Sequence, residues 1–214
     1  MNKKNILTAA ISLSLVACLS IGATLAYFTD KADPKTNTFT TGSVSISVMD
    51  ETDPQNGQVG GVKDKDTGNI TYGDASKGQK PIMPGDVISK QVSVNVENSS
   101  QPAWVALKLT VSATLDEESK LSEEQAIATI QQMIDKEVDS TKWEKGTDGI
   151  YYYQEIVEAG ETADHLFNTL TIDGDVWDND YKGMNFQIKV EAAAVQAANI
   201  TTADDAKEEI DKLF

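Results

Sequence analysis

Apolar and polar residues alternate along several segments of the chain, a pattern that predicts β-strands with one buried face. The two clearest segments are 91–97 and 104–115; in the second, every second residue from Val105 to Leu115 is apolar. The residues between them, Asn98-Ser99-Ser100-Gln101-Pro102, are typical of a turn. Shorter strand patterns cover 44–48, 150–157, 166–172 and 185–193.

Two segments have helical periodicity instead. Ser122 followed three residues later by Gln125 has the pattern of a capping box, and apolar residues recur at helical spacing from there to Val138. A helix is therefore expected over 122–138. A second, short helix is expected over 201–214, where Thr202 and Asp205 form a typical helix start.

Many strands without regular strand–helix alternation predict a fold of the mainly β class. We expect an antiparallel two-sheet sandwich, jelly-roll-like, with one inserted helix and a short C-terminal helix. The sandwich domain is expected to span 42–200, with a loop insert at 50–78, which is rich in Asp, Gly, Asn and Lys. The polar segment 27–41 before it is expected to be an extended N-terminal arm.

Residues 1–26 have the pattern of an export signal. Two Lys residues near the start precede an uncharged apolar run from Ile6 to Ala26. Small residues at Thr24 and Ala26 suit a signal peptidase, so cleavage is expected between Ala26 and Tyr27. The mature protein is then secreted, as an extracellular or cell-surface protein.

Two alternatives to cleavage remain open. The apolar run is long enough to cross a bilayer, so the signal can also serve as an uncleaved anchor. The segment Leu15-Val16-Ala17-Cys18 has the apolar-small-Cys pattern of a lipidation site, although the residues after Cys18 stay apolar where a polar tether is usual.

The excess of acidic residues argues against some classes of binding partner. The chain has 34 Asp and Glu against 18 basic residues, all of them Lys, and a formal charge of −16. Binding to nucleic acid requires clustered basic residues, so we expect no nucleic-acid partner. Contact with a membrane is expected through an uncleaved signal alone. The absence of Arg also removes the bidentate guanidinium on which many phosphate-binding and carboxylate-binding sites depend.

The residue types needed for common catalytic sites are scarce. His165 is the single His and Cys18 the single Cys, so neither a two-His zinc motif nor a Cys-based metal site can be built within one chain. No Gly-x-Ser-x-Gly elbow occurs. We therefore predict no catalytic residues and no enzymatic activity.

One acidic segment has the composition of a calcium site. Four carboxylates within a short stretch repel one another unless a cation or open solvent separates them. The candidate calcium ligands are Asp173, Asp175, Asp178 and Asp180. A solvated loop is the competing interpretation, and no other cofactor is expected.

Several segments, taken in order, resemble the TasA/camelysin family of exported proteins. The sequence Ala-Thr-Leu-Ala-Tyr-Phe-Thr-Asp at 23–30, followed by Asn-Thr-Phe-Thr-Thr-Gly-Ser-Val at 37–44, resembles the SipW-type alternate signal peptides and mature N-termini of that family. Weaker similarity continues through Pro84-Gly85-Asp86, 94–100, 103–111, 149–153, 160–162, 166–167 and 192–197.

The resemblance implies a subunit of extracellular biofilm-matrix fibres, with other copies of itself and a SipW-type signal peptidase as partners. In such fibres the mature N-terminal segment is thought to add as a strand to the sheet of the next subunit, a form of β-augmentation. The residues that would form this strand-donor arm are Tyr27, Phe28, Phe39, Val44 and Ile46.

The same family implies two alternatives. Camelysin has been described as a metallopeptidase, so a surface metallo-endopeptidase is one of them, although this chain has no recognisable ligand set. The other is a monomeric secreted or cell-surface protein of the same fold.

Overall fold

The computed structural model describes residues 29–32, 44–52, 59–63, 65, 70–73 and 78–214. Its strands are β1 (Thr29–Ala32), β2 (Ile46–Glu51), β3 (Val62–Lys63), β4 (Ile70–Thr71), β5 (Val87–Val96), β6 (Ala103–Thr114), β7 (Trp143–Lys145), β8 (Ile150–Tyr153), β9 (Phe167–Thr171) and β10 (Asn185–Gln196). Its helices are α2 (Glu123–Glu137), α3 (Ala203–Ile210) and the short 3-10 helices η2 (Asn179–Tyr181) and η3 (Ala197–Asn199).

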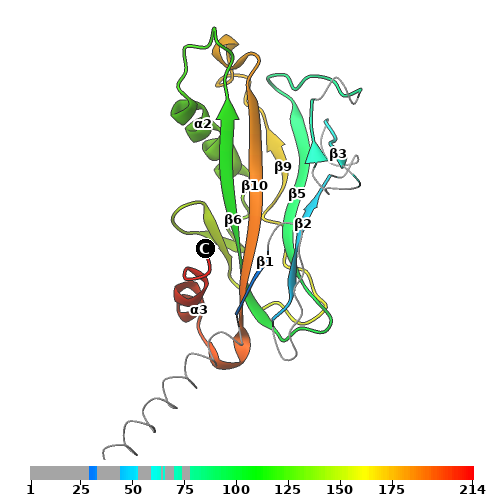
Figure 1. Ribbon diagram of the computed structural model, residues 1–214, viewed down its shortest axis with the longest axis vertical. Helices are drawn as coiled ribbons and strands as arrows, with labels where there is room; N and C mark the ends of the chain where they lie inside the picture. Colours follow the sequence, from blue (N-terminus) through cyan, green and yellow to red (C-terminus); the bar gives the residue numbers. More distant parts are fainter. Residues whose placement is uncertain (1–28, 33–43, 53–58, 64, 66–69, 74–77) are drawn as a thin grey trace, which may run out of the picture.

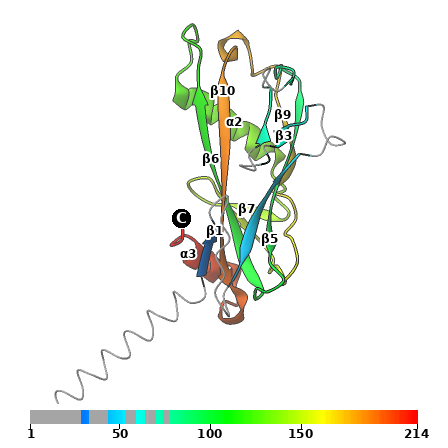
Figure 2. The ribbon, with the colours of Figure 1, turned by 45° about the vertical axis from the view of Figure 1, so that its right-hand side comes forward.

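Two antiparallel sheets face each other as a sandwich (Figures 1 and 2). The first sheet has the strand order β1-β10-β6-β8-β7, the second has the order β2-β5-β9, and β3 pairs separately with β4. The prediction of a mainly β, two-sheet antiparallel sandwich with an inserted helix and a short C-terminal helix is confirmed.

Strand β6 shows how the alternating pattern builds two apolar layers. Val105 and Leu107 point toward the second sheet and are fully buried in the main core. Trp104 and Ala106 point to the other face of the first sheet, where α3 covers them in a second cluster. Because full burial of a large apolar side chain stabilises a fold by about 1.5–3 kcal/mol, both layers contribute to stability.

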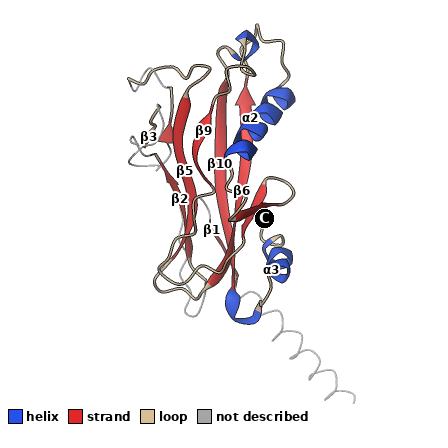
Figure 3. Ribbon diagram, turned by 180° about the vertical axis from the view of Figure 1, so that it is seen from behind, coloured by secondary structure: helices blue, strands red, loops and turns tan. Residues whose placement is uncertain are grey.

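Helix α2 closes one side of the sandwich. Its capping box forms as the sequence predicts: the amide of Gln125 donates to Ser122 Oγ at 3.2 Å, and the amide of Ser122 donates to Gln125 Oε1 at 2.9 Å. The apolar face of α2 packs against β6 of the first sheet and β9 of the second (Figure 3). Its buried residues are Ala126, Ile130, Met133 and Ile134.

Helix α3 is shorter than the expected segment 201–214. It ends at Ile210, and the chain then turns so that Leu213 and Phe214 pack against the same cluster as the helix. Lys207 Nζ donates to Glu144 Oε2 at 2.7 Å, which attaches α3 to β7. The helix is thus held by apolar packing and by an ion pair.

The insert at 50–78 contributes to the second sheet. Strand β2 ends at Glu51, and Val59 then pairs in parallel with Ile88 on the same side of β5. Lys90 lies on β5 between the part paired with β2 and the part paired with Val59. Its ammonium is buried and donates to both carboxylate oxygens of Asp50, at 2.7 and 2.8 Å. The described part of the insert therefore completes a sheet edge rather than forming a loop alone.

The three consecutive tyrosines of β8, residues 151–153, are all buried. Neighbouring residues of a strand point to opposite faces, and here the main core covers one face and α3 the other. Each hydroxyl donates to a carboxylate, and burial together with that carboxylate raises the pKa of each phenol. The three acceptors, from α2, the chain after α3 and the segment before β9, are Asp135, Asp211 and Asp164.

Asp135 joins α2 to the first sheet and makes stability depend on pH. Partial burial acts to raise its pKa, but hydrogen bonds from Lys145, Tyr151 and Gln131 outweigh burial and lower it. A carboxyl group whose pKa is lowered by folding stabilises the fold above its unfolded-state pKa of about 3.9, and this contribution is lost as the pH falls through the lower folded-state value.

We therefore expect Asp135→Asn to lower the free energy of unfolding by about 1–2 kcal/mol at pH 7, because the charged acceptor of these bonds is lost. The difference from the unsubstituted protein should shrink as the pH falls below the unfolded-state pKa of about 3.9 and through the lower folded-state value, because Asp135 itself is then protonated. Urea unfolding along a pH series from 7 downward measures this. Glu158→Gln, at an exposed position, is the control. If both variants lost the same free energy of unfolding at pH 7, the stabilising role of Asp135 would be contradicted.

Candidate functional site: the open edge of strand β10

Strand β10 is paired along its whole length on one side but over a short stretch on the other. Each of its 12 residues has a partner on β6. On the other side, β1 runs antiparallel to β10 and pairs Thr29–Ala32 with Val195–Ala192. Within the described residues, no strand pairs with 185–191 on that side. Unpaired N–H and C=O groups at a sheet edge are a template for another strand.

The burial of inward-facing side chains changes along β10. Ala192 and Ala194, beside β1, are fully buried, and Val190, just beyond it, is buried as well. Farther along, Phe186 and Ile188 pack on the core but are half-buried. On β2, which lies beside β10, Val48 is half-buried as well. Apolar surface therefore remains accessible between β2 and β10, on the side of the sandwich that α2 does not close.

The outward face of the same stretch is polar. Asn185, Gln187 and Lys189 are exposed, and Lys189 Nζ pairs with Glu191 Oε1 at 2.9 Å. A Lys on an edge strand is one of the features that limit uncontrolled pairing between sheets. The edge thus combines a half-covered apolar face, a charged outer face and a backbone available for hydrogen bonding.

The structure separates the predicted strand-donor residues into two groups. Val44 and Ile46 are buried in the chain's own core, and Ile46 pairs with Val96 of β5. They belong to the second sheet, and we confine the proposed donor arm to 27–41. The other members of the set, together with the expected cleavage site, lie outside the described residues: Ala26, Tyr27, Phe28 and Phe39.

Two of the four predicted calcium ligands, Asp173 and Asp178, engage their carboxylates in local contacts. Asp173 pairs with Lys136 at 3.1 Å, a bond that lowers the Asp173 pKa, and it also accepts from the amide of Asp175. Asp178 caps η2 by accepting from the amide of Asp180. In the described part of the chain, no three His, Cys, Asp or Glu residues are grouped so that they could hold a metal ion. Calcium binding stays a prediction.

His165 lies two residues before β9 and is half-buried. Its Nδ1 is 2.8 Å from Asn168 Oδ1. In the tautomer with a proton on Nδ1, the ring donates to this amide oxygen, and the contact orients the ring.

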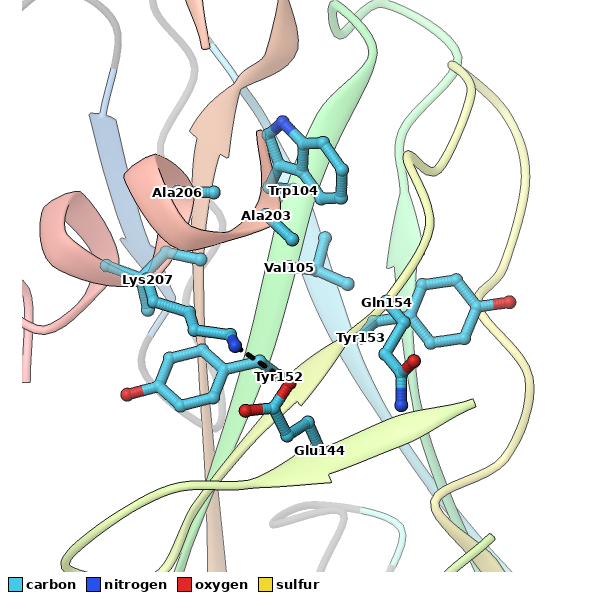
Figure 4. A pocket seen from close by; sticks show the side chains of 10 residues that line it. Trp104, Val105, Glu144, Tyr152, Tyr153, Gln154, Ala203, Ala206 and Lys207 are labelled. Carbon is cyan, nitrogen blue, oxygen red and sulfur yellow. Dashed lines mark hydrogen bonds and ion pairs between the residues drawn. The ribbon is translucent and has the colours of Figure 1, made fainter. Parts of the chain in front are cut away.

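The surface of the described residues has hollows of two different sizes. One, between α3 and the first sheet, has a volume of about 10 Å³, room for a single water molecule. Figure 4 shows Trp104, Tyr152 and the Lys207–Glu144 pair around it. The other is a cleft of about 300 Å³ between α2 and the turn after β9, at the low end of the range for small-molecule sites.

Comparison of the chain with protein-family models, with curated proteins and with solved structures finds no match. Among the helices of the described residues, none has the length and apolar character needed to cross a membrane.

Hydrogen exchange can test the state of this edge in the monomer. Backbone amides within 185–191 that point away from β6 should exchange at least tenfold faster than amides of 192–195 that face β1, because no described strand protects the first group. Amides of β6 that face β10 are the internal standard for full protection. Equal protection along both sides of β10 would show that the edge is already covered.

Proposed function

We propose that the mature chain is a secreted structural protein that assembles with copies of itself into extracellular fibres. In this proposal, the arm 27–41 of one copy pairs with the β10 edge of the next. The observation that carries the proposal is the half-paired edge of β10, with its half-buried Phe186 and Ile188. An added strand would complete the backbone hydrogen bonds and cover these side chains.

The length of the arm supports exchange between copies. In the monomer, β1 pairs with four residues of β10. The segment 27–43, at about 3.3 Å per residue, reaches on the order of 55 Å when extended, whereas the stretch 185–195 of β10 is about 35 Å long. An arm from a second copy can therefore pair with the whole edge, and each added cross-strand pair contributes about 0.2–1 kcal/mol.

A contact between an arm and an edge is heterologous, because the two surfaces differ. Each copy then still offers one free arm and one free edge, and such contacts extend into an open filament unless they close into a ring. Removal of residues 1–26 would free the arm for this exchange. The resemblance to the TasA/camelysin family supports processing by a SipW-type signal peptidase and a place in a biofilm matrix.

The arm can be tested without changing chain length. Replacing 27–41 of the mature protein by a Gly/Ser segment of equal length should abolish filaments in electron micrographs, because the substituted arm lacks β-propensity and apolar side chains.

The melting temperature of the Gly/Ser variant is the control for folding. It should fall by a few degrees at most, because β1 is a short edge strand. Unchanged filaments in this variant would refute strand donation, and a wild-type protein that forms no filaments under any condition of salt or pH would refute the fibre itself.

The net charge predicts how assembly responds to solution conditions. Without residues 1–26, which contain Lys3, Lys4 and no acidic residue, the formal charge becomes −18. Copies therefore repel one another, and screening shortens this repulsion from about 10 Å at 0.1 M salt to about 3 Å at 1 M.

We expect assembly, followed by light scattering, to accelerate several-fold at high ionic strength, with divalent cations, or as the pH falls toward the sequence pI of about 4.3. The Gly/Ser arm variant under the same conditions controls for unspecific precipitation. Assembly rates that do not change with salt or pH would contradict the prediction that electrostatic repulsion between copies slows association.

A further inference from the structure

Strand β2 is an edge strand of the second sheet, and its apolar pattern alone does not fix its register on β5. Its inward-facing residues Ile46 and Val48 lie opposite Val96 and Val94. Because β5 has valine at three alternate positions, 92, 94 and 96, a shift of β2 by two residues would again place apolar side chains opposite each other. A shift by one residue is excluded, since it would turn every side chain of β2 to the other face.

The inward face of the β2–β5 ladder includes one charged residue among its paired positions. Asp50 lies opposite Val92, two residues after Val48 on the same face of β2. Its carboxylate accepts hydrogen bonds from the ammonium of Lys90, at 2.7 and 2.8 Å. The side chain of Lys90 is 8% exposed and that of Asp50 is 29% exposed. A shift that separated the two would leave a buried ammonium without a counter-charge, which is strongly destabilising.

One of the two possible two-residue shifts separates this pair. It would bring Asp50 opposite Val94, the present place of Val48. Asp50 would then lie four residues along β5 from Lys90, or about 13 Å, which is farther than a lysine side chain reaches. The carboxylate would also lie among the valines of the core, where it finds no hydrogen-bond donor.

The opposite shift is blocked by the backbone of Val59. This shift would bring Asp50 directly opposite Lys90 and Glu51 opposite Ser89. Val59 already pairs with that part of the β5 edge: its amide donates to the carbonyl of Val87 at 3.0 Å, and its carbonyl accepts from the amide of Ser89 at 2.9 Å. A shifted β2 would need the same amide of Ser89, so the two segments exclude each other.

We infer that Lys90 is a positioning residue that fixes the register of β2 through its pair with Asp50, with Val59 blocking the opposite shift. This register keeps Val48, and not a carboxylate, on the apolar surface between β2 and β10. The role belongs to the single chain, so it holds whether or not copies assemble, and its tests use the monomer.

Disulfide trapping can measure the register directly, because the sequence from residue 27 onward contains no Cys. Ser47 lies opposite Asn95, so the pair Ser47→Cys/Asn95→Cys has the Cα separation that a disulfide needs. Met49 is diagonal to Asn95, about 7–8 Å away. The pair Met49→Cys/Asn95→Cys therefore crosslinks readily only after the shift that separates Asp50 from Lys90.

Replacement of both charged partners by apolar residues tests the inference. In the background Lys90→Met with Asp50→Leu, the Met49→Cys/Asn95→Cys pair should crosslink at least tenfold faster than in the unsubstituted background. The melting temperature should fall by no more than about 2 °C, because exchange of a buried ion pair for apolar residues is often neutral or stabilising. The matched control is Lys136→Met with Asp173→Leu, which removes an exposed ion pair and should leave the crosslinking rate unchanged.

The single variant Lys90→Met provides a second measurement if the double variant does not fold. Its remaining carboxylate, Asp50, is partly exposed and can be hydrated, so the sandwich should still form. Hydrogen exchange of the β2 amides that face β5 should then accelerate at least tenfold more than exchange of the β6 amides that face β10.

Two results would overturn the positioning role. One is an equal acceleration of exchange in both ladders of Lys90→Met, which would show a contribution to overall stability alone. The other is a folded double variant in which Ser47→Cys/Asn95→Cys still crosslinks readily and Met49→Cys/Asn95→Cys stays as slow as in the unsubstituted background.

Discussion

The antiparallel ladder between β6 and β10 is the constraint on which the rest of the structure depends. It runs through all 12 residues of β10, and its register places one set of side chains in the main core and the alternate set on the opposite face of the sheet. Helix α2 packs beside β6, and α3 covers the lower part of the outward face. On the other edge of β10, the described residues contribute one short strand, β1.

This arrangement leaves the sandwich asymmetric. On the side of α2, a helix with four buried residues joins the two sheets and is held further by Asp135. On the opposite side, β2 and β10 lie next to each other with half-buried apolar residues along them. An incomplete edge has a cost in exposed apolar surface and unpaired backbone groups, and a strand from another copy removes that cost.

The acidic composition has two roles. Some carboxylates are structural: Asp135, Asp164 and Asp211 accept hydrogen bonds from the buried tyrosines, and Asp50 neutralises the buried Lys90. Most others are exposed and produce a long-range repulsion between copies. In the proposed fibre, backbone pairing would act at contact distance, whereas this repulsion is screened by salt, so the acidic surface would oppose assembly at low ionic strength and permit it at high ionic strength.

Local patterns in the sequence were sufficient for the fold class, the longer strands and the two α-helices, but not for the short strands β1, β3, β4 and β7. The alternation of 104–115, the capping box at Ser122 and the helix start at Thr202 depend on neighbouring residues alone, and the structure has β6, α2 and α3 there. The resemblance to the TasA/camelysin family implied a donor role for the arm, and this role stays a proposal. The open edge of β10 within the described residues, the burial of all three tyrosines and the pairing of Asp50 with Lys90 could be decided by the tertiary structure alone. Whether a strand lies at an edge, and what covers each face, depends on sheet order and on contacts between residues far apart in the chain.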